Sequence, residues 1–109
     1  MDSQIEFSPK AIYQIANVMA TQNSADPNYM KGPELVSLFN TLGYLDAYTF
    51  SDGRGIQTID YGEGLSRLTY VTKRLQDLNK VCQVPNAIQE FCNRVQQPSE
   101  FVDSMKKLL

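Results

Sequence analysis

Histidine is absent from this 109-residue sequence, and its absence removes most of the side-chain chemistry that enzyme sites use. Without imidazole there is no Ser-His-Asp triad, no Cys-His dyad, no two-histidine metal site and no side chain that titrates unperturbed near neutral pH. The two cysteines, Cys82 and Cys92, are too few for a four-ligand zinc site and lack the C-x-x-C spacing. We therefore expect two small core residues here, and no metal or other cofactor.

The glycine-rich segment SDGRGIQTIDYGEG is the next candidate for chemistry. It lacks the lysine and hydroxyl of a phosphate-binding loop, and no convincing buried strand precedes it as a Rossmann fingerprint requires. Asp52, Asp60 and Glu63 supply carboxylates, but arginine and isoleucine occupy the next two alternating positions after Asp52, where an EF-hand needs oxygen ligands. No pair of acids stands out for acid–base catalysis. We interpret the segment as a structured loop whose glycines permit positive φ, and we expect no enzymatic activity.

Five amphipathic segments, separated by proline and glycine, predict helices. They cover residues 9–22, 32–43, 66–80, 85–95 and 98–109. Ser8 before Pro9 is typical of an N-cap, and Gly43 suits the left-handed position that follows a helix. Between residues 44 and 64 the helical period disappears, and there we expect only a short helical turn over Leu45–Tyr48 and a glycine-hinged loop.

These elements predict an all-α fold, a compact bundle of five to six short helices around one core, with a glycine-rich central loop and a single domain over residues 1–109. The alternative is a short hairpin arm in GIQTIDY, where Ile56, Thr58 and Asp60 would face one way. No apolar run is long enough to span a bilayer, so we expect no membrane span. The first residues lack a basic region followed by an apolar stretch, so we expect no secretion signal and a cytoplasmic location.

Charge is distributed unevenly along the chain, although the formal net charge is only −2. Residues 1–63 carry eight acidic and three basic side chains, a balance of −5, whereas residues 64–109 carry four acidic and seven basic ones, a balance of +3. If the two parts occupy different faces, the basic side of one copy can meet the acidic side of another. The alternative is ordinary surface variation, if helices from the two parts interleave.

The third predicted helix carries the main interface candidates. Arg67 and Arg74 share one edge beside apolar residues and have no acidic neighbour on the helix, whereas Lys73 and Lys80 lie beside Asp77. For Arg67, an internal role in capping loop carbonyls is an equally good reading. The full set of predicted interface residues is Arg67, Arg74, Lys73, Lys80, Asp46, Asp52, Asp60 and Glu63.

Two stretches, LVSLFNTLGYLDAYTF and GLSRLTYVTKRLQDLN, resemble the N-terminal helical modules that precede effector regions in bacterial antiphage and abortive-infection proteins. The resemblance covers roughly residues 30 to 80. It implies a death fold like that of caspase-recruitment domains, which joins sensor, protease or pore-forming partners through homotypic contacts. The positions that it carries over, mostly as residues that define the fold, are Leu38, Phe39, Asn40, Gly43, Asp46, Tyr48, Ser66, Arg67, Tyr70, Arg74, Leu75 and Asn79. The glycine-rich insertion between the two stretches is longer than a compact death fold uses.

Together these observations predict a non-catalytic adaptor in antiphage defence that assembles with itself or with a related helical domain on an effector or protease. The alternative is a nucleic-acid-binding helical domain, in which Arg67 and Arg74 would contact phosphates. The net charge of −2 lacks the strongly basic footprint of such domains, so we expect no nucleic-acid partner.

Overall fold

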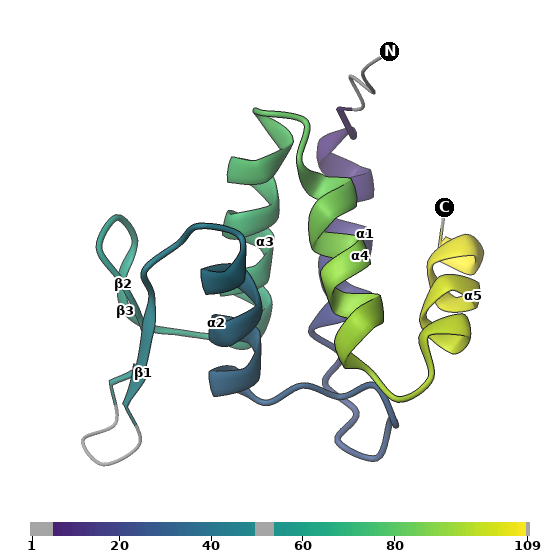
Figure 1. Ribbon diagram of the computed structural model, residues 1–109, viewed down its shortest axis with the longest axis horizontal. Helices are drawn as coiled ribbons and strands as arrows, with labels where there is room; N and C mark the ends of the chain where they lie inside the picture. The colour runs from purple at the N-terminus through teal and green to yellow at the C-terminus, as the bar shows by residue number, and fades with distance from the viewer. Residues whose placement is uncertain (1–5, 50–53, 109) are drawn as a thin grey trace.

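A three-stranded antiparallel sheet accompanies five helices in the computed structural model, which describes residues 6–49 and 54–108. The order of elements is α1 (Pro9–Met19), α2 (Gly32–Thr41), β1 (Ala47–Thr49), β2 (Gly55–Thr58), β3 (Gly62–Leu65), α3 (Arg67–Asn79), α4 (Val84–Arg94) and α5 (Pro98–Leu108). The sheet lies at one side of the helices, beside α2 and α3, and α5 lies at the opposite side (Figure 1). Within the described residues no helix is both long and apolar enough to cross a membrane.

The five predicted helices are confirmed, with ends that shift by a few residues. Ser8 caps α1 by accepting a hydrogen bond from the backbone N–H of Ala11 at 3.2 Å, and Ser66 caps α3 by accepting one from Thr69 at 3.1 Å. Gly43 has a φ of +109° directly after the last residues of α2, as its position predicted. Proline and serine at helix starts, and glycine after a helix end, were therefore reliable signals.

The all-α prediction is wrong, because the irregular segment folds into a sheet with strand order β1-β2-β3. The helical turn expected over Leu45–Tyr48 is also wrong, since Ala47–Thr49 is a strand that pairs with Gly55–Gln57. Strands of three or four residues carry little alternation, and β3 reads Gly-Glu-Gly-Leu, which has neither β-branched nor aromatic side chains. The hairpin alternative for residues 55–61 was nearer to the observed fold.

Among the described residues, the glycines that indicated a loop in the sequence lie in or beside the sheet, and Gly64 shows why a strand can need one. Ile56 pairs with Leu65 and Gln57 pairs with Glu63, so Gly64 is the extra residue of a β-bulge. It has a φ of +73°, and its N–H donates to the carbonyl of Arg54 at 2.7 Å. Because the bulge needs this left-handed conformation, glycine here is a requirement of the hairpin.

The helices and the sheet share one apolar core. Phe39 of α2 meets Tyr70 of α3 edge to face with ring centroids 5.5 Å apart, and Phe91 and Phe101 pack α4 against α5 at 4.4 Å. The sheet contributes Ile56, which is 1% exposed. Most of the apolar stripes predicted for the helices are buried in this core, so the helical periodicity identified the inward faces correctly.

The Ser66 cap makes the junction between β3 and α3 testable. We expect Ser66→Ala to lower the free energy of unfolding by about 1 kcal/mol, because the first turn of α3 loses an acceptor for its N–H groups. Urea denaturation followed by circular dichroism measures the change. Ser104→Ala, an exposed serine inside α5, is the matched control and should have no such cost; equal effects would contradict the assigned cap.

Candidate functional site

Arg74 lies at the centre of a polar cluster, although it is only 2% exposed. Its Nε and Nη2 donate to the two carboxylate oxygens of Asp46 at 3.0 and 2.7 Å. Nη1 and Nη2 donate to Asp60 at 3.0 Å each, and Nη1 also donates to Asp77 at 3.0 Å. A guanidinium has five N–H donors, so every one of them has a carboxylate acceptor here.

Three elements supply these carboxylates. Asp46 precedes β1, Asp60 lies in the turn between β2 and β3, and Asp77 is one turn beyond Arg74 on α3. The buried pair of Arg74 and Asp46, with side chains 3% and 2% exposed, therefore ties the sheet to α3. Asp60 is 51% exposed and forms the outer edge of the cluster.

Three tyrosines complete the surroundings of the guanidinium. Its Cζ lies 4.1 Å from the ring centroid of Tyr44, 5.3 Å from that of Tyr61 and 5.9 Å from that of Tyr70. Tyr70 donates its hydroxyl to Asp46 at 2.6 Å, and Tyr61 donates to Asp77 at 2.7 Å. We refer to these residues as the Arg74 cluster, which consists of Arg74, Asp46, Asp60, Asp77, Tyr44, Tyr61 and Tyr70.

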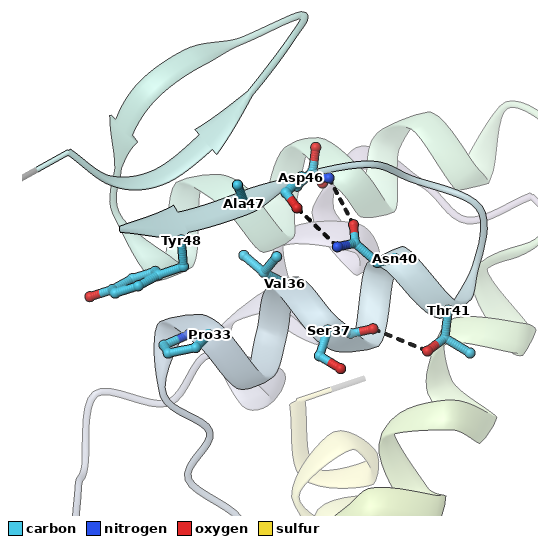
Figure 2. Close-up of a pocket in the computed structure, with 8 residues that line it drawn as sticks. All are labelled: Pro33, Val36, Ser37, Asn40, Thr41, Asp46, Ala47 and Tyr48. Atoms are coloured by element: carbon cyan, nitrogen blue, oxygen red, sulfur yellow. Dashed lines mark hydrogen bonds between the residues drawn. The ribbon is translucent and has the colours of Figure 1, made fainter. Parts of the chain in front are cut away.

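Asn40 of α2 fixes the backbone of Asp46. Its Oδ1 accepts from the N–H of Asp46 at 2.8 Å and its Nδ2 donates to the carbonyl at 2.9 Å, as Figure 2 shows. These bonds lie beside an open groove between α2 and the start of β1, about 550 Å³ in volume. Among the described residues that line it, all but Asp46 are neutral, and the carboxylate of Asp46 bonds to Arg74. The two Asn40 bonds thus hold the start of β1 against α2, and the groove beside them offers few groups for chemistry.

Hydrogen bonds and burial shift the pKa values of three groups in the Arg74 cluster. The bonds from Arg74 lower the pKa of Asp60 below its ordinary value of 3.8. The hydrogen bond to Asp77 raises the pKa of Tyr61 to about 12, and burial raises the pKa of Tyr70. Near neutral pH the Asp60 carboxyl is therefore ionised and both phenols are protonated. Asp60 pairs with Arg74 and the phenols donate hydrogen bonds to carboxylates, so these three groups are suited to stabilise the ion pairs and not to transfer protons.

The two arginines predicted at the interface are both engaged within the fold. Arg74 does have an acidic neighbour on its helix, because Asp77 pairs with it three residues away, and the expectation that it lacks one is wrong. Arg67 donates to the carbonyls of Met30 at 2.8 Å and Thr21 at 2.9 Å and lies 4.3 Å from the ring of Tyr29. The alternative of carbonyl capping by Arg67 is thus confirmed.

The remaining predicted residues are divided between the cluster and the surface. The Nζ of Lys73 lies 4.8 Å from the ring centroid of Tyr61, whereas Lys80 is exposed after the end of α3. Asp77, expected to compensate these lysines, bonds instead to Arg74 and Tyr61. Glu63 is exposed on β3, and Asp52 lies outside the described residues.

Sequence reasoning missed two residues on the rim of the cluster. Leu45 is 83% exposed and Ile59 is 89% exposed, and both line a pocket of about 270 Å³ whose other lining residues are Gly43, Tyr44, Asp46, Asp60 and Arg74. We call this the Asp60 pocket. An isoleucine in the turn between two strands was the available signal, because hairpin turns favour glycine, asparagine and aspartate.

Comparison with protein-family models, curated proteins and solved structures finds no match. Among residues 6–49 and 54–108 no group of three or more His, Cys, Asp or Glu side chains is placed to hold a metal ion.

Removing the guanidinium tests the central role of Arg74. We expect Arg74→Met to lower the free energy of unfolding by about 3–5 kcal/mol, because it leaves the buried carboxylate of Asp46 without its counter-charge. Arg94→Met is the matched control: Arg94 pairs with Glu90 at 2.7 Å nearer the surface, and its loss should cost about 1 kcal/mol or less. Similar losses from both variants, measured by urea denaturation, would show that the Arg74 cluster is not a main determinant of stability.

The lowered pKa of Asp60 predicts an acid dependence with a definite sign. The stability that ionised Asp60 contributes is present above its unfolded pKa and is lost as the pH falls through the lower, folded pKa. We expect stability to fall less steeply with acidification in Asp60→Asn than in the wild type, as measured by urea denaturation at a series of pH values. Asp103→Asn, at an exposed position of α5, serves as control and should retain the wild-type slope.

Proposed function

We propose that this protein is a non-catalytic interaction module that binds another protein, a second copy of itself or a related domain, through the Asp60 pocket. The observation that carries the proposal is the exposure of Leu45 (83%) and Ile59 (89%) on the rim of one pocket beside a half-exposed carboxylate. A single exposed aliphatic residue is ordinary, but two that share a charged pocket are typical of a contact surface.

Neither side chain is explained by the needs of the fold. Both lie in connections and not in the buried core, and burying each in a contact would contribute about 1.5–3 kcal/mol. Tyr44 and Asp60, which lie beside them in the chain, are held against Arg74. The pocket is therefore organised before a partner arrives, which reduces the entropy lost on binding.

The resemblance to antiphage adaptor modules supports homotypic assembly and recruitment of an effector or protease in the cytoplasm. That setting rests on the resemblance alone, and an all-helical death fold is not part of the proposal. The nucleic-acid alternative loses support, because Arg67 and Arg74, the residues that favoured it, donate their hydrogen bonds within the fold.

Loss of the rim side chains tests the proposal. We expect the wild-type protein to self-associate with rising concentration in analytical ultracentrifugation, and Leu45→Ser or Ile59→Ser to weaken association at least about tenfold. Folding should be unaffected, because both side chains are exposed. Tyr13→Ser, which changes a 53% exposed side chain on α1, is the control and should leave association unchanged.

At about 1 mM, even association with a binding free energy of about −4 kcal/mol would be detected. A wild-type protein that is still monomeric at this concentration would contradict homotypic assembly.

A further inference from the structure

The loop after α3 carries an exposed aliphatic side chain, as the Asp60 pocket does, but the charge beside it is positive and not negative. Val81 is 62% exposed and follows the exposed Lys80, so a branched aliphatic side chain and a positive charge stand together. We call residues 80–83 the Val81 loop. Val81 is one of four large apolar side chains found exposed in the described part of the chain, and two of the others, Leu45 and Ile59, line the Asp60 pocket.

We propose that the Val81 loop of one copy occupies the Asp60 pocket of a second copy, so that molecules join head to tail. This inference rests on the proposed function and names the partner surface for it. Val81 packs between Leu45 and Ile59 of the second copy, and Lys80 approaches Asp60.

Charge favours this pairing. The Arg74 cluster holds three carboxylates against one guanidinium, a balance of −2, and Lys73 beside Tyr61 offsets only one of these charges. Lys80 forms no ion pair with any residue that the structure describes. A lysine brought beside the half-exposed Asp60 therefore gains a counter-charge without breaking an existing pair.

Size and rigidity also fit. A closed cavity of about 150 Å³ is enough for benzene, so an open pocket of about 270 Å³ admits a valine side chain. Backbone hydrogen bonds hold the Val81 loop against the end of α3: Val81 and Gln83 donate to the carbonyl of Leu78 at 3.1 and 2.8 Å, and Cys82 donates to that of Asn79 at 3.2 Å. The loop thus loses little conformational entropy when it docks.

The two surfaces lie at different places on the molecule. The Val81 loop joins α3 to α4 at one end of these helices (Figure 1). The residues that line the Asp60 pocket come instead from the hairpin turn, from the connection that precedes β1 and from Arg74 of α3. Each copy therefore keeps a free loop after its pocket is filled, and the contact repeats into a chain or a ring. A symmetric contact of pocket with pocket would instead bring two negatively charged clusters together.

Mixing two variants tests the head-to-tail arrangement. Ile59→Glu blocks the pocket and leaves the loop intact, and Val81→Glu blocks the loop and leaves the pocket intact. We expect each variant alone to be monomeric by light scattering after size-exclusion chromatography, and the equimolar mixture to form a dimer that grows no further. Tyr13→Glu is the control variant and should assemble as the wild type does.

The outcomes separate this inference from the proposed function. If Val81→Glu assembles normally while Ile59→Glu does not, the pocket binds a different surface and the head-to-tail contact is wrong. A mixture of variants that remains monomeric also overturns it. Lys80→Glu should weaken assembly at least about tenfold at low salt and less at high salt, because a screened charge pair contributes less. A wild-type chain that never assembles refutes both the inference and homotypic assembly.

Discussion

The need to satisfy a buried guanidinium constrains one side of this fold. Arg74 is enclosed within α3, the start of β1 and the hairpin turn, and its five N–H groups find acceptors only because Asp46, Asp60 and Asp77 meet there. Leaving one partner of a buried ion pair uncompensated costs several kcal/mol, so the sheet and α3 are strongly held in this arrangement. The neighbouring Asp60 pocket is built partly from this arrangement, because Asp46, Asp60 and Arg74 line it.

Part of the uneven charge along the chain is neutralised within the folded protein. Asp46 and Asp60 belong to the acidic part of the sequence and Arg74 to the basic part, and they neutralise one another inside the molecule. Part of the attraction that we expected between copies is therefore used within each copy. What is left for contacts is the excess carboxylate of the cluster and exposed lysines such as Lys80.

Local signals in the sequence predicted the helices well and the site poorly. Capping serines, prolines and the apolar period of 3.6 residues report on neighbours within one turn, and these identified five helices and most of the core. Asp46 and Arg74 are 28 residues apart, and no local pattern indicates that they meet. An arginine at the edge of an apolar stripe has the same pattern whether it lies in an interface or, like Arg74, inside the fold. The sheet was missed for a related reason, since a strand such as Gly62–Leu65 is defined by its partner and its bulge more than by its own residues.

All five N–H donors of Arg74 are bonded, and this limits which residues can replace it. A lysine has three donors that diverge from a single atom, and it cannot bind two carboxylates edge to edge while reaching a third. A change at position 74 alone would leave acceptors without donors, and a change at position 46 alone would leave donors without acceptors. Across homologous chains, the arginine and its aspartates should therefore be kept together or be replaced together, and their joint substitution pattern would identify this fold even where the rest of the sequence has diverged.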